Sequence, residues 1–209
     1  MKKVYIVRHG ETDNNRQHIF QGSGIDASLN ETGFAQAEAL CPFFQSRKID
    51  EIAVSSLKRT YQTVQPVAVM KHLSVSTYSE LDEMNFGELE GVPVQKASPK
   101  IDELRKKWEA GKTDEPVPGG ESPEEVYQRG SQKIKQLLSD NTSQYWLFVL
   151  HGRLIRILLS GWLYGDLRYM LKIQHSNAGI NVLQFDNGRF EPLLLNYTAH
   201  LNNHPAIAD

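Results

Sequence analysis

The fold of this chain is decided by residues 4–12, which carry the sequence VYIVRHGET. The apolar, β-branched run that opens this stretch predicts a buried strand over 3–7. Arg8, His9 and Gly10 follow at the point where that strand ends. Because ligands of open α/β sheets bind outside the carboxyl ends of the strands, these residues predict an anion site at one edge of such a sheet.

Strand-like and helix-like patterns alternate along the rest of the chain. Strands are predicted over 3–7, 51–55, 74–78, 145–150, 180–186 and 189–196. Helices are predicted over 31–46, 57–71, 122–138 and 153–163. This alternation indicates βαβ units, so we expect an α/β protein, a three-layer α/β/α sandwich with a mostly parallel sheet. Asn187-Gly188 predicts a hairpin between the last two strands, which adds an antiparallel edge strand.

Residues 84–121 interrupt this alternation. The segment is rich in glycine and proline and carries a charged helical piece around residues 101–110. We interpret it as a helical lid insertion over the sheet. The whole chain, residues 1–209, is expected to form a single domain around that sheet.

The totals for the 209 residues narrow the class of protein. The formal net charge is -2, so no basic field points to a nucleic-acid partner. No apolar run approaches the length of a membrane span, so we expect no membrane partner. Cys41 is the single cysteine, which favours a reducing compartment and predicts a cytoplasmic protein. Cys41 shares helical spacing with Phe34 and Phe44, and this apolar face is predicted to be buried.

Two further strand ends repeat the pattern of the first. The strand at 51–55 is followed by Ser56, predicted to cap the next helix, and by Arg59 in its first turn. The strand at 145–150 is followed by His151-Gly152. If the strands are parallel, their ends bring arginines, histidines and helix N-termini around one point. That combination of fixed positive charge and free backbone N–H groups favours a phosphoryl group.

A pair of histidines suits covalent phosphoryl transfer. A neutral imidazole has a free lone pair near physiological pH and can attack phosphorus, which divides one difficult displacement into two easier ones. The chain shows no ligand cluster with metal spacing, so we expect no metal and no cofactor. His200 and His204 are four residues apart, but their Asn/Pro-rich surroundings predict a disordered tail instead of a metal site.

The stretch RHGET at 8–12 resembles the signature of the histidine phosphatase superfamily, in its phosphoglycerate mutase-like branch. Further matches follow in the order of the family and cover nearly the whole chain. They are Asn15, Gln21-Gly22, Asp26, Leu29, Gly33, SSLKRTYQT at 55–63, LDE at 81–83, Phe86-Gly87, Glu90-Gly91, PGGES at 118–122 and His151-Gly152.

The resemblance implies a role for each matched site residue. His9 would be the nucleophile that becomes phosphorylated. Glu83 would protonate the leaving oxygen and then activate water. The groups that bind the phosphoryl group and stabilise its charge would be Arg8, Arg59 and His151. The phosphate pocket would be completed by Asn15, Gln21, Gly22 and Gly152. The substrate would be a small phosphorylated metabolite, and a homodimer is an assembly that the resemblance allows.

The acidic segment around Glu83 leaves the proton donor open on the residues alone. The other carboxylates of that segment are Glu80, Asp82, Glu88 and Glu90. Any of them could supply the proton, and a solvated loop is the alternative explanation for their charge. The resemblance favours Glu83 among them.

Two other matches have an architectural explanation. Ser122 and Glu125 form a predicted capping box, with proline at the first helical position. Gly119 and Gly120 are predicted to form the turn into that helix. Neither match therefore requires a substrate.

Arg153 stands directly after His151-Gly152, where a small residue is common in the family. It could add positive charge for a second acidic group of the substrate, or point outward from its helix, and the sequence leaves both open. The three residues at 23–25, between Gln21-Gly22 and Asp26, are similar in number to fructose-bisphosphatase members. That spacing is a weak guide to the substrate.

The expected function is therefore a metal-independent phosphomonoesterase that acts through a phosphohistidine intermediate. Mutases of this branch have a long basic insertion after the motif that contains the glutamate, and segment 84–121 is shorter and lacks an adjacent arginine pair. A phosphoglycerate mutase is the first alternative. A non-catalytic phosphate-binding or interaction module is the second. The residues that argue against such a module are Arg8, His9, Arg59, Glu83 and His151.

Overall fold

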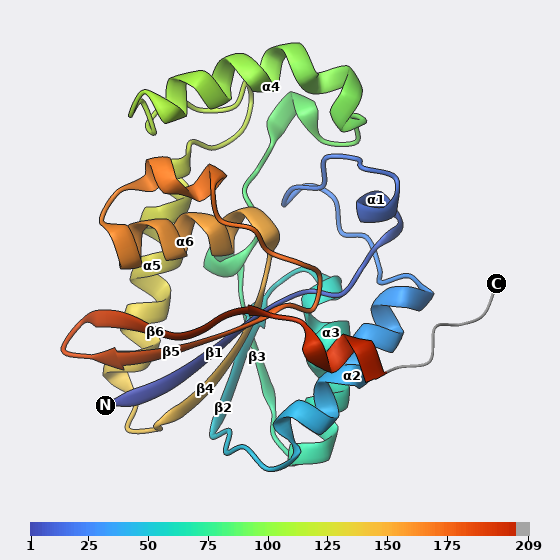
Figure 1. Cartoon of the computed structure of the whole chain (residues 1–209), viewed down its shortest axis with the longest axis vertical. Helices are drawn as coiled ribbons and strands as arrows, with labels where there is room; N and C mark the ends of the chain where they lie inside the picture. The colour runs from blue at the N-terminus through green and yellow to red at the C-terminus, as the bar shows by residue number, and fades with distance from the viewer. Residues whose placement is uncertain (204–209) are drawn as a thin grey trace.

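A computed structural model describes residues 1–203 as a sheet covered by helices on both faces (Figure 1). The strands are β1 (Lys2–Arg8), β2 (Glu51–Ser55), β3 (Val75–Tyr78), β4 (Tyr145–Leu150), β5 (Ile180–Asp186) and β6 (Arg189–Tyr197). The α-helices are α1 (Asp13–Arg16), α2 (Glu31–Gln45), α3 (Lys58–Lys71), α4 (Val94–Glu109), α5 (Pro123–Asp140) and α6 (Gly152–Tyr164). The 3-10 helices are η1 (Ser79–Leu81), η2 (Gly87–Leu89), η3 (Leu167–Leu171) and η4 (Ala199–Asn203).

The strands form one sheet in the order β3-β2-β4-β1-β5-β6. The neighbours from β3 to β1 are parallel, whereas β5 runs antiparallel to β1, and β6 antiparallel to β5. The mostly parallel sheet with an antiparallel edge is confirmed, and so is the predicted hairpin between the last two strands. The turn between them has positive φ at Asn187 (47°) and Gly188 (80°), as a two-residue hairpin turn requires.

Each face of the sheet has its own hydrophobic core. Val4 and Ile6 of β1 pack in the core shared with α5 and α6. Tyr5 and Val7 pack in the opposite core, shared with α2 and α3. Side chains of a strand alternate between its faces, so a continuous apolar run is what a strand buried on both sides needs. The predicted α/β/α sandwich is confirmed.

The helix in segment 84–121 is longer than the sequence suggests. α4 begins at Val94 and continues through Pro99, whereas the predicted helical piece begins only at residue 101. The buried side chains at helical spacing across this proline are Ala97, Ile101, Leu104 and Trp108. Their burial against the core of α5 and α6 offsets the backbone hydrogen bond that a proline removes. In Figure 1, α4 lies beyond the carboxyl ends of the parallel strands.

The chain after β6 departs from the prediction of a disordered tail. Residues 199–203 form η4, in which His200 is buried. The His200 ring stacks on Tyr197 with 5.7 Å between ring centroids and lies 6.2 Å from the ring of Phe43 in α2. Packing against α2 orders this turn, and such a long-range contact is invisible in the local composition. His204 lies outside the described residues.

The face of α2 around Cys41 follows the prediction only in part. Cys41 is half-buried against the core of α2 and α3, and burial raises the pKa of its thiol. Phe34 is predicted on the same buried face, but 46% of it is exposed because it lies in the first turn of the helix, outside the core. Within residues 1–203, no helix combines the length and apolar content needed to cross a membrane.

Candidate active site

The carboxyl ends of the parallel strands bring the predicted site residues together. His9 follows β1, and His151 follows β4 and is the N-cap residue of α6. Both rings are buried, and their centroids lie 5.2 Å apart. Arg59 reaches the same point from the first turn of α3, with Nε 3.2 Å from Nδ1 of His151. The predicted convergence of strand ends is therefore present.

The His9 ring is held in one tautomer. Its Nδ1 lies 2.7 Å from the carbonyl oxygen of Gly10, and because a carbonyl only accepts, Nδ1 carries the proton. Nε2 is then the nitrogen with the free lone pair. Burial, followed by the positive charges of Arg59 and Arg8, lowers the pKa of His9 well below its ordinary value of 6.5. The ring is therefore neutral at physiological pH, and the lone pair of Nε2 is unprotonated.

His151 is oriented from both sides. Its Nδ1 accepts from Arg59, so Nε2 is the protonated nitrogen and donates to Oγ of Ser55 at 2.7 Å. Burial and then the charge of Arg59 lower the pKa of this ring well below 6.5. The Ser55 hydroxyl at the end of β2 thus fixes a second imidazole beside the first.

Arg59 is fully buried and fixed by the loop before α2. It donates to the carbonyl oxygens of Ile25 at 2.7 Å and Gly22 at 3.3 Å. The Gln21 amide satisfies its neighbours when its nitrogen donates to Oγ1 of Thr12 at 2.7 Å and its oxygen accepts from Nη1 of Arg59 at 2.9 Å. Burial lowers the pKa of Arg59 to about 10, which leaves the guanidinium charged at neutral pH.

The predicted cap of α3 is wrong. The N-cap residue is Leu57, which makes no side-chain capping bond. Ser56 instead donates from its backbone N–H at 2.8 Å and from its hydroxyl at 2.7 Å to the Asp82 carboxylate. This contact ties the exit of β2 to the segment that precedes Glu83.

Arg8 lies against the first residue of α6. Its Nη1 donates to the carbonyl oxygen of His175 at 2.7 Å, and burial, followed by the charge of Arg156, lowers its pKa to about 10. A Cβ atom built on Gly152 would lie only 3.0 Å from Nε of Arg8. Glycine at this position therefore leaves room for the guanidinium beside the helix N-terminus, where free N–H groups favour anions.

The Asn15 amide is oriented by its oxygen. Oδ1 accepts from the backbone N–H of Thr12 at 3.2 Å and from Nδ2 of Asn177 at 3.1 Å. The same Asn177 amide also donates to the carbonyl oxygen of His9 at 3.1 Å. Because the oxygen of Asn15 is engaged, its amide nitrogen is the end that could donate to a bound anion. Sequence reasoning missed Asn177, which belongs to none of the matched motifs.

Glu83 is the carboxylate of the acidic segment that reaches the N-terminus of α6. Its Oε1 accepts from the backbone N–H groups of Met84 and Leu154, both at 2.9 Å, and its Oε2 accepts from that of Arg153 at 3.0 Å. Three of the neighbouring carboxylates bind other groups. Glu80 pairs with Lys133, Asp82 accepts from Ser56, and Glu90 accepts from Gly24 and Phe86. Geometry favours Glu83, because it is bonded to backbone N–H groups at the start of α6, two and three residues after His151.

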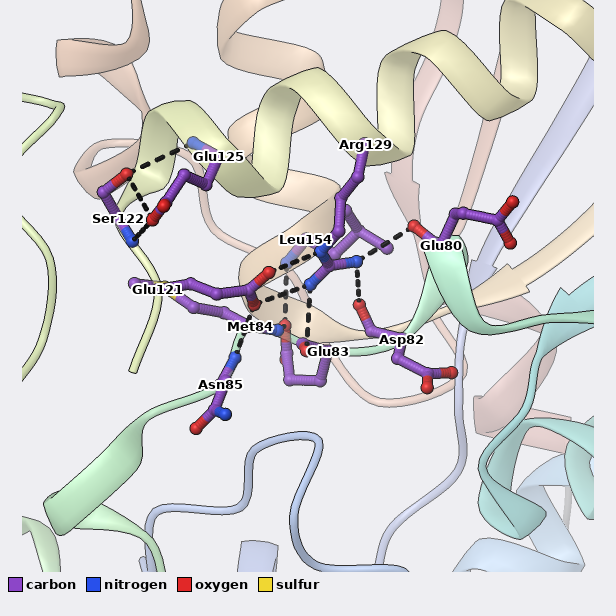
Figure 2. Close-up of polar contacts among 10 residues, drawn as sticks. All are labelled: Glu80, Asp82, Glu83, Met84, Asn85, Glu121, Ser122, Glu125, Arg129 and Leu154. Atoms are coloured by element: carbon purple, nitrogen blue, oxygen red, sulfur yellow. Dashed lines mark hydrogen bonds and ion pairs between the residues drawn. The ribbon is translucent and has the colours of Figure 1, made fainter. Parts of the chain in front are cut away.

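The backbone before Glu83 is held by Arg129 of α5 (Figure 2). Nη1 of Arg129 donates to the carbonyl oxygens of Glu80 at 2.9 Å and Asp82 at 2.8 Å, and Nη2 donates to that of Glu83 at 3.1 Å. Nε of the same guanidinium donates to Oε1 of Glu121 at 2.7 Å. Sequence reasoning missed Arg129, since an arginine in an amphipathic helix gives no signal of its own.

The motif at 118–125 has the architectural role that the sequence predicts. Ser122 and Glu125 form a capping box at the start of α5, with Pro123 in its first turn. Gly119 has a φ of 70°, and a Cβ on Gly120 would lie 2.3 Å from the carbonyl oxygen of Asn85. Both glycines therefore serve the turn into the helix.

No group of three or more metal-ligating side chains occurs within residues 1–203. The charges around His9 are those of arginines. Arg153, which the sequence leaves either inward or outward, is buried at 9% exposure.

Comparisons with known proteins agree with this geometry. The profile of the histidine phosphatase superfamily (branch 1) matches residues 4–198. Phosphoserine phosphatase 1 of Hydrogenobacter thermophilus is 30% identical over 201 residues, which cover 96% of this chain and 95% of that protein. Phosphoglycerate mutase-like protein 4 of Arabidopsis thaliana is 32% identical over 159 residues, covering 75% and 69%.

Solved structures show the same likeness. A phosphoserine phosphatase from Entamoeba histolytica, in complex with 3-phosphoglyceric acid, superposes with a TM-score of 0.85 at 28% identity, covering 96% of this chain and 100% of that one. A mycobacterial glucosyl-3-phosphoglycerate phosphatase shares the fold, with a TM-score of 0.85 at 24% identity over 95% of this chain and 100% of the other. From the profile match over nearly its full length, this chain belongs to the histidine phosphatase superfamily.

Proposed function

We propose that this protein is a metal-independent phosphomonoesterase that hydrolyses a small phosphorylated metabolite through a phosphohistidine on His9. The observation that carries the proposal is the His9 tautomer, with Nδ1 bonded to the Gly10 carbonyl and Nε2 left with its lone pair. Family membership and the phosphatases among the similar proteins support it.

In the first step, Nε2 of His9 attacks phosphorus, and the bond from phosphorus to the ester oxygen breaks. Glu83 takes up a proton beside the negative charge of the bound phosphate and gives it to the leaving alkoxide, which departs as an alcohol. Arg8 and Arg59 neutralise the oxygens of the transferring group. The negative charge of the phosphate would raise the pKa of His151 from its low value in the free protein, so that this ring also becomes a cation.

In the second step, the Glu83 carboxylate takes a proton from water, and the resulting hydroxide attacks the phosphohistidine. The N–P bond breaks, inorganic phosphate leaves, and His9 is restored. Glu83 carries the proton taken from water and releases it to solvent, which returns it to the carboxylate. The pocket for the phosphoryl group would be completed by Asn15, Gln21, Gly22 and the backbone N–H of Gly152.

The proposal is tested by hydrolysis of p-nitrophenyl phosphate and by trapping the phosphoenzyme. His9→Ala should reduce kcat by at least about a thousandfold, because the covalent route is lost. His72→Asn, a change at an exposed histidine, is the matched control. Phosphate trapped on the wild-type protein should be labile in acid and stable in alkali, as expected of a phosphohistidine. Equal rates for wild type and His9→Ala would overturn the nucleophile assignment.

A phosphoglycerate mutase is the second candidate, favoured by the likeness to the mutase-like Arabidopsis protein. A mutase would transfer the phosphoryl group to a phosphoglycerate before water attacks. Rapid-quench measurement of the phosphoenzyme therefore separates the two. Transfer to 2- or 3-phosphoglycerate faster than to water would identify a mutase. A wild-type protein inactive on every phosphate ester would instead support a non-catalytic binding module.

We further propose that residues 1–209 form one domain in which segment 84–121 acts as a lid over the site. Packing of α4 on the core of α5 and α6 supports this arrangement. A cytoplasmic location is supported by the single cysteine, Cys41. The homodimer that the family resemblance allows is tested by light scattering of the purified protein.

A further inference from the structure

Two arginines of α6 are not used by the proposed reaction. Arg153 is 9% exposed, and its Nη1 is buried with no hydrogen-bond partner among the described residues. Arg156 lies one helical turn further along and is half-buried, and its Nε is buried with no hydrogen-bond partner among the described residues. Buried guanidinium groups are normally paired, because an uncompensated charge in the interior is destabilising. These two side chains therefore need an explanation.

The two arginines continue the positive charge of the phosphate pocket. The charge of Arg156 lowers the pKa of Arg8, whose Nε is also buried without a hydrogen-bond partner among the described residues, and it lowers the pKa of Arg153 as well. The carboxylate that opposes this charge is Glu83, and its oxygens already accept the backbone N–H groups at the start of α6. Three cations face one carboxylate, so the region has an excess of positive charge.

The opposite wall of this region is supplied by α4. The guanidinium of Arg153 lies 5.8 Å from the centroid of the Trp108 ring. The charge of Arg105, in the same helix, also lowers the pKa of Arg153. Arg105 itself forms an ion pair with Asp102 at 3.3 Å. The aromatic ring orients Arg153 without neutralising it, since a ring face attracts a cation but carries no net charge. Arg153 is thus held in place, and its Nη1 has no hydrogen-bond partner among the described residues.

We propose that Arg153 and Arg156 form a second anion subsite beside the phosphate pocket, which binds a second negatively charged group of the substrate. This inference rests on the proposed phosphatase function and narrows its substrate to phosphate esters with another carboxylate or phosphate. A planar guanidinium suits both groups, because its donors match paired oxygens. The bound group would supply the counter-charge that the free protein lacks.

Matched substrates test the subsite and distinguish the two anions. 3-Phosphoglycerate and glycerol 3-phosphate differ by a carboxylate, and fructose 1,6-bisphosphate and fructose 6-phosphate differ by a phosphate. In one of these pairs, wild type should favour the doubly anionic member by at least about tenfold in kcat/KM. Arg153→Met and Arg156→Met should reduce that preference to less than about threefold, mainly by raising KM. Arg153→Lys should keep part of it.

Arg189→Met is the matched control, since Arg189 is an exposed arginine at the hairpin, away from the carboxyl ends of the strands. It should keep the full preference. Folding is checked by the urea midpoint, and Arg153→Met should unfold at the same or a higher urea concentration because it removes an unpaired buried charge. No preference in wild type, or equal losses on both members of a pair in the arginine variants, would overturn the subsite.

Binding separates the failure of this inference from the failure of the proposed function. Calorimetry with His9→Ala measures the affinity for 3-phosphoglycerate and for glycerol 3-phosphate without hydrolysis, and the bisphosphate pair is measured in the same way. If His9→Ala keeps its phosphatase activity, the nucleophile assignment fails, while a binding preference lost in Arg153→Met still supports the subsite. Equal affinity within both pairs contradicts the subsite even when hydrolysis proceeds as proposed.

Discussion

At the scale of single residues, the site depends on space left by glycine as much as on charge. Gly152 is the first residue of α6, and its missing side chain allows Arg8 to lie beside the helix N-terminus. Alanine is the better helix former, so Gly152→Ala should leave the urea midpoint unchanged or slightly raised. It should lower kcat/KM for p-nitrophenyl phosphate by about ten- to a hundredfold, because the guanidinium must move. Full activity in this variant would show that Arg8 tolerates displacement.

Buried histidines make the stability of this protein sensitive to acid. Burial, helped by Arg8, lowers the pKa of His175 to about 3, and the pKa values of His9 and His151 are also well below 6.5. Below pH 6.5 the unfolded chain binds protons at these rings while the folded protein does not. Each ring therefore removes up to about 1.4 kcal/mol of unfolding free energy per pH unit as the pH falls from 6.5 toward its folded pKa.

Urea midpoints measured between pH 7 and pH 4 test this dependence. His175→Gln should show a shallower loss of stability than wild type, since one buried ring is gone. His72→Asn, at an exposed residue with a φ of 55°, should follow the wild-type curve. A wild-type midpoint that stays constant down to pH 5 would contradict the assignment of neutral buried rings.

Individual residues also show where local sequence stops being informative. His9, Arg59 and His151 could be predicted to meet, because each directly follows or opens an element at the same edge of a parallel sheet. Ser56 has a hydroxyl that could cap a helix. Its hydroxyl and its backbone N–H instead donate to Asp82, which lies in a distant segment of the chain. The contact with Asp82 outweighs the local capping preference of Ser56, and such a long-range contact cannot be predicted from the spacing of residues in the sequence.

At the scale of elements, α5 controls the position of the proposed proton donor. Arg129 donates to three carbonyl oxygens, those of Glu80, Asp82 and Glu83, while the Glu121 carboxylate accepts from the same guanidinium. A lysine keeps the charge but has one ammonium group in place of a planar fork, so it cannot make all of these bonds. Arg129 is therefore a positioning residue for Glu83.

Arg129→Lys should affect substrates according to their leaving groups. Glycerol 3-phosphate needs a proton on its departing alkoxide, and its kcat should fall by about ten- to a hundredfold. p-Nitrophenolate leaves without a proton, and kcat for its ester should fall by less than about threefold. Gln128→Ala on the same helix, whose side chain donates to Glu124, is the control. Equal losses on both substrates would indicate a purely structural role for Arg129.

Helix boundaries could be predicted where local signals mark them and could not where long-range packing decides them. The helices α2, α3, α5 and α6 begin and end within two residues of their predicted limits, because amphipathic spacing and a capping box mark them. The full length of α4 could not be predicted, because a proline inside a helix is unfavourable and Pro99 therefore predicts a helix boundary. The apolar residues on either side of it bury one continuous face, and that burial outweighs the lost backbone bond.

At the scale of the whole molecule, one edge of the sheet concentrates positive charge that the fold itself does not neutralise. The layers and strand order follow from buried alternating strands, and so the fold class could be predicted from the sequence. The excess of cations over carboxylates could not, because it depends on which arginines turn inward. Arg153 is the clearest case, since its sequence position is compatible with either direction.

This uncompensated charge predicts that an anion stabilises the molecule as a whole. Inorganic phosphate at a hundred times its Kd should add about 2.7 kcal/mol to the free energy of unfolding, or roughly 5–10 °C in Tm for a chain of this size. Chloride at the same ionic strength should give a much smaller rise, because it screens charge without the oxygens that accept from guanidinium groups. Arg59→Met should lose the specific response to phosphate, as it removes a fully buried cation of the pocket. If chloride and phosphate raise Tm equally, the stabilisation is general screening, and the strand ends do not form a built phosphate site.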